Sequence, residues 1–257
     1  MLLAADIGNT NITFGLYLGD RLHTTFRLET LKCGTADEYG ESLLRFLREA
    51  RVPPQEIDAV IMASVVPGAS AALGRGIKTH LKRQPFLVEP HIRTGITVKT
   101  DFPEKVGADR IVNAAAAYFY YGPALVIDFG TATTYDVVAE GGEFLGGVIA
   151  PGVKVCGEAL WEKTAKLPKI SIRKPDRVLG TNTVSSMQSG LFYGCLGQVE
   201  YLAVRLKEEL GSSLKTIATG GLSSLFRGCT DAIDIYDEHL TLNGLNLLYR
   251  LNHAPCP

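Results

Sequence analysis

The sequence lacks the short motifs that identify several large enzyme classes. It contains no G-x-x-x-x-G-K-[ST] segment and no G-x-G-x-x-G segment after a predicted strand, which argues against P-loop and Rossmann-type nucleotide sites. Neither H-E-x-x-H nor G-x-S-x-G occurs, so metalloprotease and α/β-hydrolase functions are disfavoured. The 5 cysteines form no C-x-x-C pair, and their odd number and wide spacing favour neither a zinc site nor a disulfide framework.

Excess charge of one sign and long hydrophobic runs are also missing. The formal net charge is -1, so we expect no bulk attraction to nucleic acid or to an anionic membrane. Asp6 interrupts the first apolar run too early for a signal peptide, and the apolar run at 59–66 is too short to span a bilayer. These features favour a cytoplasmic protein with reduced cysteines, and 257 residues suffice for one large domain or two small ones.

One pattern of residues occurs twice in the chain. The first copy reads MLLAADIGNTNITFGLYLGD at 1–20, and the second reads PALVIDFGTATTYDVVAEGGE at 123–143. In each copy an apolar run leads into Asp-x-Gly, at Asp6 and at Asp128, and an alternating stretch and a glycine turn follow. Alternation of period two with glycine turns predicts a three-stranded antiparallel meander in each copy.

Helical patterns follow both meanders. Thr35-Ala36-Asp37-Glu38 has the pattern of a capping box and predicts a helix through Ala50. Apolar residues at steps of three or four predict a long helix from Asn182 or Thr183 to Leu210. Further helices are expected at 109–121 and 153–167, and further strands at 58–64 and 215–219. The order strand-strand-strand-helix-strand, read twice, predicts two similar α/β domains, 1–117 and 118–257.

An Asp-x-Gly at a strand end has a chemical use. Glycine lets backbone N–H groups approach a ligand closely, Thr and Asn add donors for phosphate oxygens, and a carboxylate can hold a hydrated cation. One such turn alone is most often structural, but two copies from two facing domains favour binding of a polyphosphate. A third glycine motif, Ala218-Thr219-Gly220-Gly221-Leu222, follows a predicted strand. It indicates either close approach to a nucleobase or ribose, or a simple strand-to-helix turn.

These motifs resemble those of the actin, hexokinase and acetate-kinase superfamily and, more closely, those of type III pantothenate kinase. The shared stretches run in order along the whole chain. They are DIGNTN at 6–11, GADR at 107–110, DFGTATT at 128–134, LGG at 145–147, APG at 150–152, AKLP at 165–168, NT at 182–183, MQSG at 187–190, ATGGL at 218–222 and LTLNGL at 240–245. The resemblance implies an α/β fold of two ribonuclease-H-like domains with a cleft between them. The βββαβα unit is duplicated, so that each domain contains one copy.

The resemblance also implies an activity and a set of site residues. The family phosphorylates pantothenate to 4'-phosphopantothenate with ATP and Mg²⁺, at the first step of coenzyme A biosynthesis, with K⁺ or NH₄⁺ as a monovalent cation and as a homodimer. By resemblance Asp109 is the catalytic base, Asp6 faces Mg²⁺-ATP and Asp128 binds the monovalent cation. ATP binding is implied for Asp6, Ile7, Gly8, Asn9, Thr10, Asn11, Ile12, Thr13, Thr131, Gly220 and Gly221. Pantothenate binding is implied for Thr100, Gly107, Ala108, Asp109, Arg110 and Thr183.

Several alternatives stay open at the level of sequence. Thr100 and Phe102 stand where the family typically has tyrosine and asparagine, which would suit a kinase for another small hydroxyl or carboxylate substrate. A nucleotide-binding regulator without catalysis is the other alternative, although it would not need to keep Asp109. The small residues on one side of the long predicted helix favour close packing within the chain, with a subunit contact as the alternative. They are Ser186, Gly190, Gly194 and Gly197.

Overall fold

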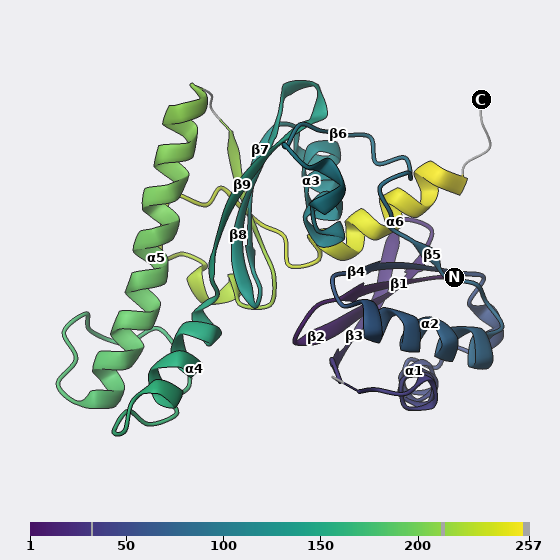
Figure 1. The fold of residues 1–257 in the computed structure, drawn as a ribbon, viewed down its shortest axis with the longest axis horizontal. Helices are drawn as coiled ribbons and strands as arrows, with labels where there is room; N and C mark the ends of the chain where they lie inside the picture. The colour runs from purple at the N-terminus through teal and green to yellow at the C-terminus, as the bar shows by residue number, and fades with distance from the viewer. Residues whose placement is uncertain (32, 212–213, 254–257) are drawn as a thin grey trace. The chain divides into compact units, whose positions relative to one another are not determined.

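The computed structural model describes residues 1–31, 33–211 and 214–253. The chain forms two compact units, each of which combines a sheet with helices (Figure 1). The first unit contains Met1–Ala116 together with the last helix, α6 (Leu240–His253), and the second contains Ala117–His239. The helix α3 (Ala108–Tyr121) contains the boundary between them.

The sheet of the first unit begins with the predicted meander. Its strand order is β3-β2-β1-β4-β5, in which β1, β2 and β3 pair antiparallel and β4 pairs parallel to β1. The strands are β1 (Leu2–Ile7), β2 (Asn11–Leu18), β3 (Arg21–Glu29), β4 (Ala59–Ser64) and β5 (Phe86–Leu87), and the short β6 (Thr97–Val98) follows in the chain. The helices α1 (Ala36–Glu49) and α2 (Pro67–Leu81) lie between these strands in the sequence.

Both faces of this sheet are buried at β1 and β4. Successive side chains of a strand point to opposite faces, so alternate residues of β1 enter two different cores. Leu3 and Ile7 pack in a cluster with α1 and α2, whereas Leu2 and Ala4 pack in a cluster with α3 and α6. The expected division of the chain placed 240–257 in the second domain. Instead α6 belongs to the first unit. Its apolar side chains Leu242, Leu245 and Leu248 are buried against apolar residues on one face of the first sheet.

The second unit repeats the meander. Within it the strands run in the order β11-β10-β7-β8-β9, with β7, β8 and β9 antiparallel and β10 parallel to β7. Its elements are β7 (Ala124–Phe129), β8 (Ala132–Ala139), β9 (Glu143–Pro151), α4 (Val153–Lys163), α5 (Thr183–Leu210), β10 (Lys215–Thr219) and β11 (Ile235–Tyr236). Phe192, Leu196 and Val199 of α5 pack on one face of this sheet. Short 3₁₀ turns occur in the two units at Pro54–Glu56, Pro103–Lys105, Glu140–Gly142 and Ser223–Phe226.

The helix ends show which local signals act. The capping box at α1 is confirmed, since the Glu38 amide donates to Thr35 Oγ1 at 3.2 Å and the Thr35 amide donates to Glu38 Oε2 at 2.8 Å. The predicted long helix is confirmed as α5, whose N-cap Asn182 accepts from the Ser185 amide at 2.9 Å. The predicted helix 153–167 is too long, because Thr164 is extended and ends α4.

Two further observations concern the whole of the described chain. No helix within residues 1–31, 33–211 and 214–253 is both long and apolar enough to cross a membrane. The cysteines in those ranges, Cys33, Cys156, Cys195 and Cys229, are free thiols, and Cys256 lies outside the described residues.

Candidate active site

The first Asp-x-Gly turn lies at the carboxyl end of β1. Asp6 is half-buried and pairs in register with Thr13 of β2 and Ala63 of β4. The Gly8 amide donates to the Asn11 carbonyl at 3.0 Å, and Thr30 Oγ1 donates to the Gly8 carbonyl at 2.7 Å. These bonds hold the turn in one shape.

The exposure of the predicted ATP residues in this turn varies along it. Asn9 and Thr10 are exposed, whereas Ile7 and Ile12 are fully buried in the core of the first unit. The two isoleucine side chains therefore anchor the turn in the hydrophobic core. Only their backbone groups are available to a ligand.

The GADR segment lies beside the same strand ends. A Cβ added at Gly107 would lie 3.5 Å from Val65 Cγ1, so the Gly107 backbone passes close to Val65. The Val65 amide in turn donates to the Ile7 carbonyl at 3.1 Å. In open α/β sheets ligands bind outside the carboxyl ends of the parallel strands. The first unit therefore brings the first glycine turn and the start of α3 together where such a ligand would bind.

Asp109 stands in the first turn of α3 and is half-buried. Its Oδ1 accepts a hydrogen bond from the Arg110 amide at 2.8 Å. Burial raises the pKa of this carboxyl, because water no longer solvates the charge, and the bond from Arg110 and its guanidinium only partly offset the rise. A carboxylate whose pKa is raised towards the working pH is a better general base than a solvated one.

The segment before GADR differs from the family pattern, and the structure shows how it lies. Thr100 Oγ1 is buried and has no hydrogen-bond partner among the residues that the structure describes. Phe102 is 58% exposed, and Lys105 Nζ lies 4.4 Å from its ring centroid. Phe102 is therefore largely exposed to solvent.

The second Asp-x-Gly turn is shorter than the first by one residue. Phe129 pairs with Thr133 across it, whereas Ile7 pairs with Ile12 across the first turn. The Gly130 amide donates to the Ala132 carbonyl at 3.1 Å, which closes the turn and leaves Thr131 exposed. The two sequence copies could be aligned by their aspartates, but only the pairing register reveals this difference.

The third glycine motif lies directly against the second aspartate. Thr219, the last residue of β10, pairs in register with Asp128 of β7. Gly220 follows with φ +87°, and a Cβ added there would collide with Asp128 Oδ1 and lie 2.7 Å from the Phe129 amide nitrogen. Only glycine lets the chain turn at this point and leave room for the carboxylate. The second unit therefore joins two motifs that are about ninety residues apart.

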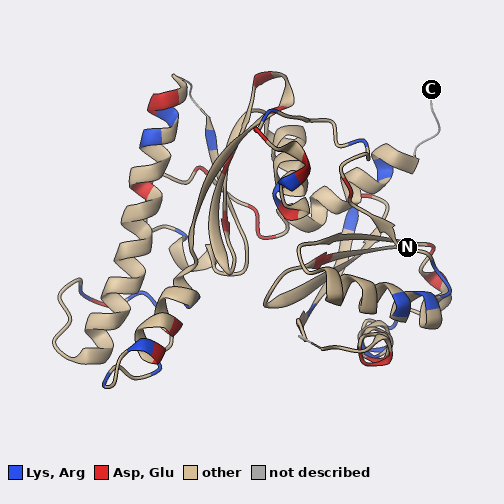
Figure 2. Ribbon diagram, viewed as in Figure 1, with Lys and Arg blue, Asp and Glu red and all other residues tan. Residues whose placement is uncertain are grey.

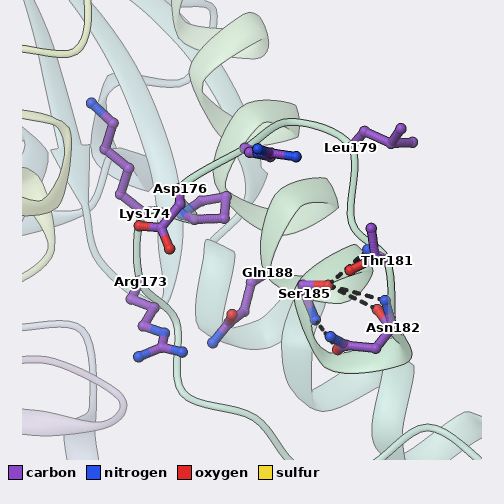
Figure 3. Close-up of a pocket in the computed structure, with 10 residues that line it drawn as sticks. Arg173, Lys174, Asp176, Leu179, Thr181, Asn182, Ser185 and Gln188 are labelled. Carbon is purple, nitrogen blue, oxygen red and sulfur yellow. Dashed lines mark hydrogen bonds between the residues drawn. The ribbon is translucent and has the colours of Figure 1, made fainter.

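Thr183 lies at another part of the second unit, as the exposed first residue of α5. A cavity of about 440 Å³ lies between the start of α5 and the preceding loop (Figure 3). Buried Gln188 supports that loop, since its Nε2 donates to the Ser171 carbonyl at 3.1 Å. The cavity is lined by Arg173, Lys174, Pro175, Asp176, Arg177, Leu179, Thr181, Asn182, Ser185 and Gln188. The cationic residues of this set, Arg173, Lys174 and Arg177, stand in none of the motifs that predicted the site from the sequence.

The sequence pattern of type III pantothenate kinase matches residues 2–205. The chain belongs to the type III pantothenate kinase family. A type III pantothenate kinase from Agathobacter rectalis is 49% identical over 252 residues, which cover 97% of each chain. Another, from Moorella thermoacetica, is 44% identical and covers 98% of this chain and 100% of the relative.

Solved structures share the fold of this type III pantothenate kinase family member. A proposed 2-dehydro-3-deoxygalactonokinase from Sinorhizobium meliloti has a TM-score of 0.60 at 12% identity, over 100% of this chain and 98% of the other. An activator of 2-hydroxyisocaproyl-CoA dehydratase from Clostridium difficile, solved with bound ADPNP, has a TM-score of 0.54 at 15% identity, over 98% and 95%. At these identities the similarity shows the fold alone, and it confirms the predicted pair of ribonuclease-H-like domains.

Proposed function

We propose that this enzyme transfers the γ-phosphoryl group of ATP to the primary hydroxyl of pantothenate, the first step of coenzyme A biosynthesis. Family membership over nearly the full length of the chain supports the reaction and the substrate. Phosphoryl transfer depends on positioning and on neutralising the charge of the phosphates, so ATP acts with Mg²⁺. We place the enzyme in the cytoplasm, where its free thiols stay reduced.

The single observation that carries the mechanism is the setting of Asp109. Its half-buried carboxylate stands beside the carboxyl ends of β1 and β4, where the first glycine turn also lies. Asp109 accepts the proton of the pantothenate hydroxyl as that oxygen attacks the γ-phosphorus, and the bond from the γ-phosphorus to the β–γ bridging oxygen breaks to release ADP. Arg110 binds the carboxylate of pantothenate, for which a guanidinium offers two parallel hydrogen bonds. Gly107, Ala108, Thr100 and Thr183 complete the proposed set of pantothenate contacts.

The glycine turns supply the proposed contacts to ATP. Asp6 orients the Mg²⁺ of Mg²⁺-ATP, and the backbone and hydroxyl donors of the first turn surround the phosphates. Thr131 is an exposed residue of the second turn. Gly220 and Gly221 let the backbone approach the nucleobase or ribose closely. The remaining proposed ATP contacts are Ile7, Gly8, Asn9, Thr10, Asn11, Ile12 and Thr13, with the two isoleucines contributing backbone groups only.

Asp128 is the proposed ligand of a monovalent cation, K⁺ or NH₄⁺. Its carboxylate oxygen lies against the backbone of Gly220, in a space that a side chain at position 220 would fill. Hard cations prefer oxygen ligands, which this arrangement supplies. The residues present therefore fit the cation, whose charge helps to neutralise the phosphates.

The proposed assembly is a homodimer that uses α5. From residue 183 to residue 199 this helix carries no charged residue (Figure 2). A Cβ added at Gly190, Gly194 or Gly197 would meet no atom of the described residues within 4 Å, so the interpretation that these glycines serve packing within the chain is wrong. On the same helix Tyr201 and Val204 are 66% and 52% exposed. An uncharged helix face with small residues allows close approach of a second copy.

The test is phosphorylation of pantothenate by the purified enzyme with ATP and Mg²⁺, with and without KCl, and with product identified by mass. We expect 4'-phosphopantothenate to form and its rate to rise with KCl. A panel of other small alcohols and carboxylates serves as the control for substrate. No product from pantothenate, with product from a panel compound, would establish the other kinase activity, for which Thr100 and Phe102 leave room.

A further inference from the structure

Thr219 presents a buried hydroxyl that has no hydrogen-bond partner in the part of the chain that the structure describes. Its side chain is fully buried, and Oγ1 makes no hydrogen bond to any residue that the structure describes. Burying a hydroxyl without a hydrogen bond is unfavourable, so folded proteins rarely keep such a group unless a ligand or an ion satisfies it. A valine would fill the same space without this loss. A ligand or an ion bound beside the oxygen atom at position 219 would remove this cost.

The position of Thr219 indicates that use. Thr219 and Asp128 are register partners on the parallel strands β10 and β7, so their side chains emerge side by side on the same face of the sheet. The Asp128 carboxylate is pressed against the Gly220 backbone, the residue that follows Thr219. A threonine and an aspartate thus stand as neighbours on one face of the sheet, at the ends of two strands.

We propose that Thr219 is a second oxygen ligand of the monovalent-cation site that Asp128 anchors. This inference rests on the proposed role of Asp128. A hydroxyl suits a cation of single charge, because it adds an oxygen ligand without adding a second negative charge. Cation binding would satisfy the Thr219 oxygen at a position where the fold itself would accept an aliphatic residue.

The same strand offers a matched control. Thr216 also has a buried hydroxyl without a hydrogen bond to any described residue. It pairs with Leu125 and faces the apolar core under α5, on the opposite face of β10 from Thr219. Thr219→Val and Thr216→Val make the same chemical change on the same strand, but only the first removes an oxygen beside Asp128.

The experiment measures cation binding in two ways. The midpoint of thermal unfolding of the full chain with Mg²⁺-ATP is recorded against KCl, at constant ionic strength maintained with choline chloride. The rate of pantothenate phosphorylation is recorded over the same KCl range. For Thr219→Val we expect the half-maximal KCl concentration to rise roughly tenfold or more in both measurements, since a polar contact to a charged group is lost. Thr216→Val should keep the parent values, and Thr219→Ser, which retains the oxygen, should respond to KCl.

Each outcome decides the inference. Equal KCl dependence of Thr219→Val and Thr216→Val would overturn it, and so would a parent enzyme whose unfolding midpoint does not respond to KCl. If Thr219→Val does not fold, a Thr219→Ser variant without a KCl response would also overturn it. A parent enzyme that does not phosphorylate pantothenate, while the unfolding midpoints respond to KCl as expected, would refute the proposed substrate and support the cation site.

Discussion

At the scale of single residues, the proposed chemistry depends on Asp109 as the general base. Asp109→Asn keeps the shape of the side chain and an oxygen for the Arg110 amide, but removes the proton acceptor. We expect turnover to fall by about 10²–10⁴-fold while ATP binding stays near the parent value. The measurement is kcat together with the dissociation constant of ATP. Turnover close to that of the parent would exclude Asp109 as the base.

The raised pKa of Asp109 has consequences for pH dependence. The base must be ionised to act, so kcat/KM should fall as the pH drops through the pKa of Asp109. That pKa lies above the value of an ordinary aspartate, which is about 3.9. Burial is the main cause of the rise, and the Arg110 guanidinium opposes it. Arg110→Gln should therefore move the acid limb of the pH profile to still higher pH. An acid limb that stays in place in this variant would contradict the coupling between the two residues.

The raised pKa of Asp109 also determines how the stability of the folded protein depends on pH. A carboxyl whose folded pKa is raised binds its proton more tightly in the folded state than in the unfolded state. The stability that this provides is present below the unfolded pKa and is lost as the pH rises through the folded pKa. At neutral pH, Asp109→Asn should accordingly unfold at the same temperature as the parent or at a higher one.

At the scale of elements, the contact between α1 and α2 depends on Gly76. A Cβ added there would collide with the Ala36 carbonyl and lie 3.1 Å from the Gly40 amide nitrogen. At Gly74, on the same helix, an added Cβ would have no atom of residues 1–31, 33–211 or 214–253 within 4 Å. Gly76→Ala should lower the free energy of unfolding by roughly 1–3 kcal/mol through overpacking. Gly74→Ala should raise it by about 0.5–1 kcal/mol, because alanine is the better helix former.

Urea denaturation of both variants and the parent provides the measurement. The two alanines differ only in what surrounds them, so the comparison isolates the packing of the two helices. A Gly76→Ala variant as stable as Gly74→Ala would mean that α1 moves away from α2 at little cost.

At the scale of the whole molecule, the proposed homodimer depends on the uncharged part of α5. Gly194→Glu places a charge on that face, and the open space at Gly194 means that the folded chain tolerates it. We expect this variant to be a monomer with a circular dichroism spectrum like that of the parent. Gly68→Glu is the control, since Gly68 is also open and lies on α2. Light scattering gives the mass, and a monomeric parent or a dimeric Gly194→Glu variant would refute the proposed interface.

Many features of this protein follow from the sequence by itself. Both meanders, the capping box at Thr35 and the start of α5 were predictable, because alternation, glycine turns and capping act between residues close in the chain. The candidate site residues also stand in short motifs, Asp-x-Gly and GADR, which the sequence displays in a few consecutive positions, and their roles stay predictions. The end of α4 was not, because Thr164 leaves the helical conformation without a glycine or proline to signal it.

Only the tertiary structure decided which of these pieces meet. The path from Gly107 through Val65 to Ile7 brings GADR to the first turn, and β10 places Thr219 and Gly220 beside Asp128. The packing of α6 in the first unit is also decided by the tertiary structure. Such contacts join residues far apart in the chain. They depend on which helices pack on which face of a sheet and on the register of the strands. A short stretch of sequence determines neither.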